Sequence, residues 1–138
     1  MTQLGKQIGQ TGRIKVLCVD DESLITMAME LAIDEAPDMV CVGFLGSADE
    51  LVDEVIQKRP DVVLLDLRMP GLDPLVALED LTAACPDVRT IVFTGWAERE
   101  RLDRAIAAGA WGFLQKNGDL QTILGTIRKV AAGQPTFA

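Results

Sequence analysis

Short, mainly apolar runs recur along the chain and are separated by polar or turn-forming residues. Runs of this length that are rich in β-branched residues are typical of strands buried on both faces of a sheet. The central run is entirely apolar, and the chain after it passes through Asp66 to the turn residues Pro70-Gly71. The pattern predicts five strands, at Arg13–Val19, Met39–Phe44, Val62–Leu65, Val88–Phe93 and Trp111–Gln115.

Between these runs, apolar residues recur at helical spacing. A stripe at i, i+3, i+4 and i+7 predicts an amphipathic helix from Ser23 to about Glu35, and capping and breaking residues mark the ends of four more helices. The stripe of the first helix is Leu24, Met27, Ala28 and Leu31; the second helix is capped by Ser47 and ends at Arg59-Pro60; the third begins at Pro74 and ends at Cys85. The fourth, Ala97–Ala108, has Leu102, Ala105 and Ile106 facing inward; the last is capped by Asp119, carries Leu120, Ile123, Leu124, Ile127 and Ala131 on one face, and ends at Gly133.

Strands and helices therefore alternate five times. This alternation predicts an α/β fold, with a parallel sheet, helices on both of its faces and right-handed crossovers. We expect one domain at residues 13–132, a loose Gly/Gln/Thr-rich tail at residues 1–12, and a stub or the start of a linker at residues 133–138.

Composition narrows the functional classes. The net charge of −8 over 138 residues argues against nucleic acid or an anionic membrane as a partner of this domain itself. No apolar run approaches 18 residues, so no membrane-spanning segment is expected. The sequence has no histidine, and its three cysteines match no metal or redox motif, which fits core thiols in a reducing cytoplasm.

Polar side chains follow four of the predicted strands. Because the carboxyl ends of parallel strands meet at one edge of a sheet, we expect these side chains to share a ligand site there. Each has an ordinary explanation alone, since aspartates cap helices and lysines are usually solvated; their coincidence is what indicates a site. The residues are Asp20 and Asp21 after the first strand, Asp66 after the third, Thr94 at the end of the fourth and Lys116 after the fifth.

These residue types indicate phosphoryl chemistry with a metal ion. Two carboxylates about 5 Å apart repel by roughly 3 kcal/mol at an effective dielectric constant near 20, so three of them favour raised pKa values or a bound cation. Mg²⁺ suits one or two carboxylates with water and a phosphate. A carboxylate such as Asp66 can itself accept a phosphoryl group. Lys116 and Thr94 can then contact the phosphoryl oxygens and offset the charge that develops on them.

Four segments together resemble the receiver domain of two-component response regulators. They are Asp20-Asp21, Asp66–Gly71 (D-L-R-M-P-G), Thr94-Gly95 and Phe113-x-x-Lys116, and the resemblance covers about Ile14 to Ala132. It implies a flavodoxin-like (CheY-like) three-layer sandwich with five helices and strand order 2-1-3-4-5. It also implies a signalling domain, rather than an enzyme, that receives a phosphoryl group from a sensor histidine kinase.

The resemblance assigns a role to each matching residue. It implies that Asp66 is the phosphoacceptor and that Thr94 and Lys116 contact the phosphoryl group. For Mg²⁺, it implies that Asp21 is a direct ligand, that Asp20 holds the metal largely through water, and that the backbone carbonyl of Arg68 is the remaining protein ligand. It also implies that Phe113 is a switch residue that changes rotamer as Thr94 moves. For Phe113, an ordinary half-buried strand aromatic is the alternative. Trp96, after Thr94-Gly95, either shapes access to the site or covers apolar surface.

The segments D-L-R-M-P-G-L-D and V-A-A-G-Q-P-T-F are similar to those of LuxR/NarL-type regulators. This likeness implies a helix-turn-helix DNA-binding output domain outside this chain, and hence control of transcription. A stand-alone regulator that acts through protein contacts is the alternative. In either case phosphorylation could pair two receivers through the helix at 97–108, the strand at 111–115 and the last helix, or through a neighbouring face.

A remote alternative is a Mg²⁺-dependent phosphohydrolase with an aspartate nucleophile. Such enzymes need an acidic residue two positions after the nucleophile. Asp66 is followed by Leu67 and Arg68, so the pattern fails there, and Asp20 with Glu22 is a poor match.

Overall fold

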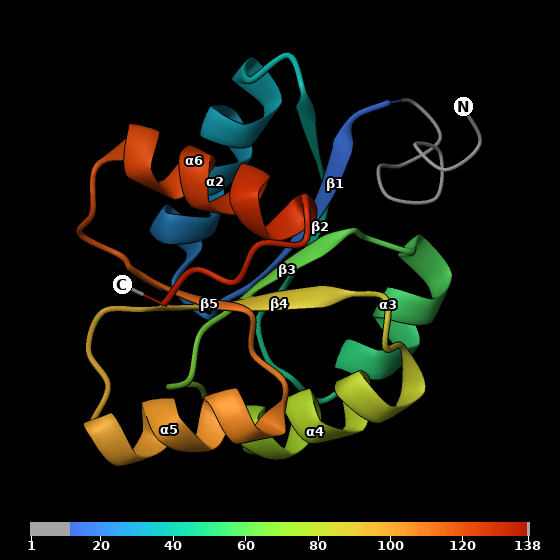
Figure 1. The fold of residues 1–138 in the computed structure, drawn as a ribbon, viewed down its shortest axis with the longest axis vertical. Helices are drawn as coiled ribbons and strands as arrows, with labels where there is room; N and C mark the ends of the chain where they lie inside the picture. Colours follow the sequence, from blue (N-terminus) through green and yellow to red (C-terminus); the bar gives the residue numbers. More distant parts are fainter. Residues whose placement is uncertain (1–11, 138) are drawn as a thin grey trace.

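The computed structural model describes residues 12–137, in which five parallel strands form one sheet between two layers of helices (Figure 1). The strand order β2-β1-β3-β4-β5 confirms the predicted 2-1-3-4-5 topology. The predicted tail at residues 1–12 lies outside the described residues except for Gly12. The strands are β1 (Ile14–Val19), β2 (Met39–Leu45), β3 (Val62–Leu65), β4 (Arg89–Thr94) and β5 (Gly112–Gln115); the helices are α2 (Ser23–Glu35), α3 (Leu51–Lys58), α4 (Pro74–Ala84), α5 (Arg99–Ala108) and α6 (Leu120–Ala131).

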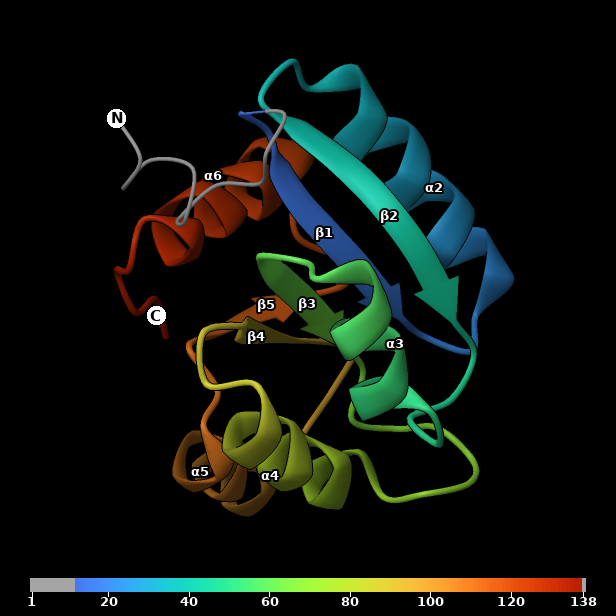
Figure 2. The same ribbon diagram turned by 90° about the vertical axis from the view of Figure 1, so that its right-hand side faces the viewer.

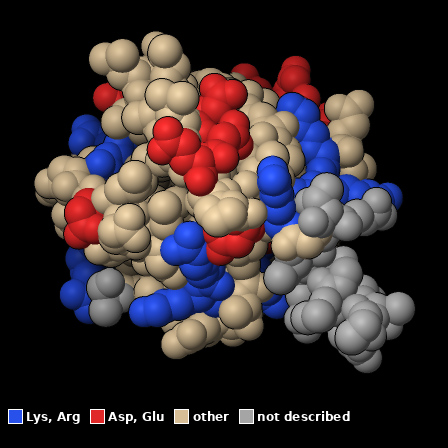
Figure 3. All heavy atoms as spheres, turned by 90° about the horizontal axis from the view of Figure 1, so that it is seen from above, with Lys and Arg blue, Asp and Glu red and all other residues tan. Residues whose placement is uncertain are grey.

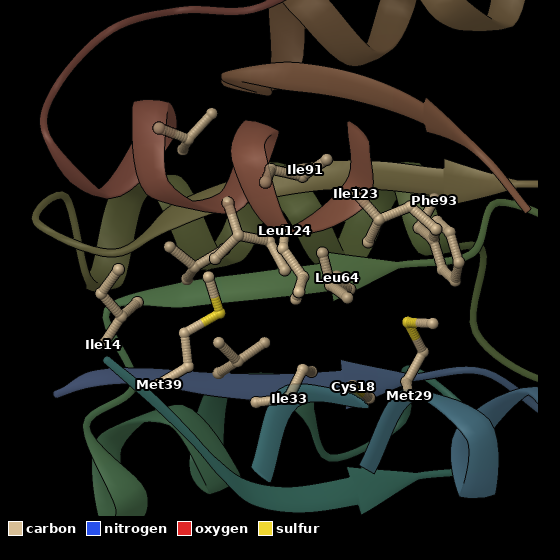
Figure 4. Packing of buried hydrophobic residues seen from close by; sticks show 14 of the residues in the cluster. Ile14, Cys18, Met29, Ile33, Met39, Leu64, Ile91, Phe93, Ile123 and Leu124 are labelled. Carbon is tan, nitrogen blue, oxygen red and sulfur yellow. The ribbon is translucent and has the colours of Figure 1, made fainter. Parts of the chain in front are cut away.

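The sheet separates two hydrophobic cores. Helices α2 and α6 cover one face, and α3, α4 and α5 cover the other (Figures 1 and 2). Because successive side chains of a strand point to opposite faces, Val16 and Cys18 of β1 join the first core, and Leu17 and Val19 join the second. Figure 4 shows the first core, where side chains of α2 and α6 meet those of the strands.

The apolar stripe predicted for α2 does not face the sheet. Leu24, Met27 and Leu31 are 80%, 59% and 66% exposed, while Met29 and Ile33 are buried in the first core. The helix is apolar on more than one face, so two apolar stripes compete for the sheet. The stripe that contains Met29 and Ile33 packs against the sheet, so the prediction that Leu24, Met27 and Leu31 face inward is wrong.

The structure also contradicts three smaller predictions, which concern one helix cap and two inward-facing side chains. Ser47 does not cap α3, because its Oγ accepts a hydrogen bond from the N–H of Asp49 in a local turn, and the helix begins later, at Leu51. Ile106 of α5 is 43% exposed, because the small residue Ala105 beside it occupies the position against the sheet. Leu120 is also exposed, at the first residue of α6. By contrast, Asp119 caps α6 as predicted, accepting from the N–H of Thr122.

Candidate functional site

Backbone hydrogen bonds beyond the ends of the strands fix the candidate residues side by side. The N–H of Asp66 donates to the carbonyl of Val19 (3.0 Å), so Asp66 lies beside the end of β1. The N–H of Lys116 donates to the carbonyl of Thr94 (3.1 Å), which sets Lys116 beside the end of β4. The ends of β1, β3, β4 and β5 therefore meet at one edge of the sheet.

The side chains at this edge form one polar network, so the predicted convergence is confirmed. The hydroxyl of Thr94 donates to Asp66 Oδ1 (3.0 Å). The ammonium of Lys116 lies 3.0 Å from Asp66 Oδ2 and 2.7 Å from Asp20 Oδ2. It also lies 2.5 Å from Glu22 Oε1. Glu22 was not predicted as a site residue, and the only sign of its role in the sequence is its place directly after the two predicted acids.

Burial sets the electrostatics of the network. Asp20, Asp66 and Thr94 are buried. Burial raises the pKa of Asp20, although its contacts with Lys116 and with the N–H of Glu22 oppose the shift. Burial also disfavours the charged form of Lys116, but the three carboxylates around its ammonium outweigh this effect and raise the pKa of Lys116. Lys116 therefore stays protonated, and the carboxylates compete for it.

Three carboxylates at this edge could hold a cation. Asp20, Asp21 and Asp66 each offer one oxygen, and these oxygens lie within 4.8 Å of one another. Asp20 Oδ2 is buried and, among the described residues, has no partner in hydrogen-bond geometry, although the ammonium of Lys116 is near. These three carboxylates outnumber the one ammonium beside them, which favours a further cation, and an all-oxygen donor set suits a hard divalent ion.

The loop after β3 and the start of the β4–α5 connection border the site. The N–H of Arg68 donates to Asp66 Oδ1 (3.1 Å), and the guanidinium of Arg68 lies over the ring of Trp96, 5.5 Å from its centroid. An open cavity of about 360 Å³ lies between these residues and the network. Its lining is Asp21, Glu22, Asp66, Arg68, Thr94, Gly95, Trp96 and Lys116.

Phe113, predicted as a switch residue, lies in β5 and is half-buried. It lines a second cavity, of about 300 Å³, together with Thr94 and Leu102. This cavity directly connects the residue that touches Asp66 with the strand that carries Phe113. The exposed indole of Trp96 borders both cavities. This position fits both alternatives for Trp96, since it can shape access to the site and also cover apolar surface.

The face drawn in Figure 3 carries charged side chains of both signs. Basic side chains lie there in separate groups among acidic and uncharged residues. Among residues 12–137, no helix combines the length and apolar character needed to cross a bilayer. The three cysteines are free thiols, with Cys18 buried in the first core.

Comparison with known proteins identifies the family. Residues 16–128 match the response regulator receiver domain, and the chain belongs to that family. It is 33% identical over 121 residues to the response regulator GacA of Pseudomonas aeruginosa, and 31% identical over 121 residues to the DNA-binding transcriptional activator DevR/DosR of Mycobacterium tuberculosis. Each alignment covers 88% of this chain and 56% of the relative, so the chain spans about half the length of the curated relatives it matches.

Solved structures support the fold. A two-component response regulator of the LuxR family from Aurantimonas sp. superposes with a TM-score of 0.83 at 23% identity, covering 90% of this chain and 89% of that chain. The CheY-like fold class is thus confirmed. The resemblance to receivers of LuxR/NarL-type regulators is confirmed by the family match together with the curated relatives.

Proposed function

We propose that this domain accepts a phosphoryl group on Asp66 from a sensor histidine kinase. The observation that carries the proposal is the environment of the Asp66 carboxylate: one oxygen accepts a hydrogen bond from Thr94, and the other lies 3.0 Å from the ammonium of Lys116. A carboxylate held between a hydroxyl and an ammonium beside other acids is suited to receive a phosphoryl group in line and to hold it.

In the proposed transfer, an oxygen of Asp66 attacks the phosphorus of a phosphohistidine on the kinase. An O–P bond forms, the N–P bond breaks, and its electron pair leaves on the imidazole nitrogen. The ammonium of Lys116 then exchanges a carboxylate contact for a phosphoryl oxygen, and the hydroxyl of Thr94 turns to another. After these short movements both donors face the oxygens on which negative charge is concentrated, so they stabilise the transferred group.

The acidic residues suit Mg²⁺. Asp21 and Asp66 would bind it directly, Asp20 would act largely through water, and the carbonyl of Arg68 would complete the protein ligands. Bound there, the ion would neutralise negative charge between the carboxylates and the incoming phosphoryl group. The three carboxylate oxygens that lie within 4.8 Å of one another support this assignment.

Phosphorylation would act by shifting a conformational equilibrium. As Thr94 turns toward the phosphoryl group, Phe113 can move into the cavity that the two residues line, which reshapes the surface of α5, β5 and α6. We infer that this surface pairs two receivers or releases an output domain. Because relatives include a DNA-binding transcriptional activator, a helix-turn-helix output in the cytoplasm is favoured over a stand-alone regulator.

Incubation with acetyl phosphate and Mg²⁺ tests the proposal. The wild-type protein should gain the mass of one phosphoryl group, and Asp66→Asn should gain none. Asp87→Asn is the matched control, because Asp87 is an exposed carboxylate just before the opposite end of β4. Labelling that persists in Asp66→Asn contradicts the assignment, and steady turnover of many phosphomonoesters would indicate a phosphohydrolase instead.

A further inference from the structure

The chain after α6 returns to the sheet and pairs with the free edge of β5. Gly133 adopts a φ of +92°, and the N–H groups of Gly133 and Gln134 close the helix on the carbonyls of Val130 and Lys129, both at 2.9 Å. Beyond this turn the chain runs toward β5, and Thr136 lies beside that strand (Figure 1).

Two backbone hydrogen bonds hold the returning chain. The N–H of Thr136 donates to the carbonyl of Trp111 (2.9 Å), and the N–H of Phe113 donates to the carbonyl of Thr136 (3.0 Å). Thr136 is thereby paired in parallel with Gly112. These bonds satisfy edge groups of β5 that would otherwise face water, so residues 134–137 act as a short additional strand.

The pairing depends on glycine at position 112. A Cβ added there would lie 2.7 Å from the carbonyl oxygen of Thr136, closer than side-chain carbons approach backbone oxygens. Any larger residue would push the returning chain away from β5. The edge of this strand is therefore shaped for close contact with the segment.

The segment also touches the proposed switch residue. The ring of Phe137 meets the ring of Phe113 edge to face, with centroids 5.1 Å apart and an interplanar angle of 70°. Phe113 in turn lines the cavity shared with Thr94. The Asp66–Thr94 hydrogen bond, the cavity that Thr94 and Phe113 both line, and the ring contact of Phe113 with Phe137 thus lead from the site to the chain after the last helix.

We propose that residues 134–137 are an intramolecular latch on β5, and that Phe137 is a positioning residue that holds Phe113 away from the cavity beside Thr94. The proposal rests on the proposed function of Asp66. The ring of Phe113 cannot both keep its contact with Phe137 and move into the cavity, so phosphorylation and latch docking oppose each other. Because such coupling is reciprocal, undocking the latch strengthens binding at Asp66 by the same factor by which binding weakens docking.

The experiment measures both ends of the coupling in this chain. Beryllofluoride with Mg²⁺ serves as the phosphoryl mimic, and amide hydrogen exchange of Thr136 reports latch docking. In the wild type, the Thr136 amide should be protected without beryllofluoride and lose protection when it is saturating. Phe137→Ala should remove the protection in both states and raise the affinity for beryllofluoride by about three- to tenfold, the factor expected for one aromatic pair.

Two further variants separate coupling from loss of stability. Gly112→Ala undocks the latch by a different route, because its methyl group would collide with the Thr136 carbonyl, and it should raise the affinity as Phe137→Ala does. Val76→Ala removes an apolar side chain of similar exposure on α4 and should leave both readouts unchanged.

The outcomes are distinguishable. A freely exchanging Thr136 amide in the wild type overturns the latch. Normal binding of beryllofluoride that neither Phe137→Ala nor Gly112→Ala alters overturns the coupling alone. A wild-type protein that binds no beryllofluoride rejects the proposed function and the coupling with it.

Discussion

At the scale of single residues, Lys116 balances the charge of the site. Its one ammonium faces the carboxylates of Asp20, Glu22 and Asp66, while Asp21 stays exposed and outside this network. Negative charge therefore exceeds positive charge, and one acid remains available for a cation. Glu22 is the most exposed of the three partners, so its contact is the one that Lys116 can release most easily when a phosphoryl group arrives.

Except for Glu22, the site residues were predictable, because each lies at the end of a strand or within two residues of it. The contact between Glu22 and Lys116 was not predictable, because the two residues are 94 positions apart in the sequence and the contact depends on the conformations of two flexible side chains. The ion pair between Asp20 Oδ2 and the ammonium of Lys116 was equally unpredictable, because spacing along the sequence does not say which carboxylate oxygen faces which donor.

Asp73 gives a residue-scale prediction that depends on pH. Its carboxylate accepts from the N–H of Leu75 (3.0 Å) as the N-cap of α4, and this bond, followed by the nearby Arg101, lowers the pKa of Asp73. Asp73→Ala should lower the free energy of unfolding by about 1 kcal/mol at pH 7, and Asp73→Asn, which keeps a capping oxygen, by less. Urea denaturation measures both.

The sign of the pH effect follows from the lowered pKa. The stabilisation by the charged cap is complete above the ordinary aspartate pKa of 3.8, and it is lost as the pH falls through the lower value of the folded protein. The difference between wild type and Asp73→Asn should therefore narrow as the pH is lowered through this range. A difference that stays constant, or widens, contradicts the role of the charge.

At the scale of elements, the strands were predictable and the helix faces were less so. Each strand is a short apolar run between turn residues, and a sheet covered on both sides accepts apolar residues at every position. A helix must instead choose a face. Helix α2 is apolar on two faces, so spacing alone could not choose between Leu24 and Met29, and only packing against β1 and β2 decides. The pairing of residues 134–137 with β5 was also not predictable from the sequence, because a single β-bridge is too short to produce a periodic pattern of apolar residues.

Helix α2 provides the corresponding prediction. Replacing the exposed residues Leu24, Met27 and Leu31 together by glutamine should change the free energy of unfolding by less than about 1 kcal/mol, because these side chains gain little burial on folding. Ile33→Ala on the buried face should cost about 2–5 kcal/mol, since it leaves a cavity in the first core. Equal losses in the two variants, measured by urea denaturation, would show that the buried face of α2 is misassigned.

At the scale of the whole molecule, the sheet joins the site to a distant surface. Strands β4 and β5 carry Thr94 and Phe113 from the edge that holds Asp66 to the face formed with α5 and α6, and the latch closes the free side of β5. A change at one carboxylate can therefore alter one surface without disturbing either core. Under the proposed function, a phosphoryl group on Asp66 would thereby control which partner that surface binds.

The proposed role of this surface in pairing two receivers can be tested directly. If the surface of α5, β5 and α6 forms the pair, beryllofluoride with Mg²⁺ should shift the protein from monomer toward dimer in analytical ultracentrifugation. Ile106→Glu should weaken that pairing at least about tenfold, because it places a charge on an exposed apolar position of α5, while phosphorylation of Asp66 stays normal. Ile56→Glu, an exposed position on α3, is the matched control and should pair as the wild type does. Unchanged sedimentation on adding beryllofluoride argues against pairing, and a dimer that tolerates Ile106→Glu but not Ile56→Glu places the contact on the neighbouring face instead.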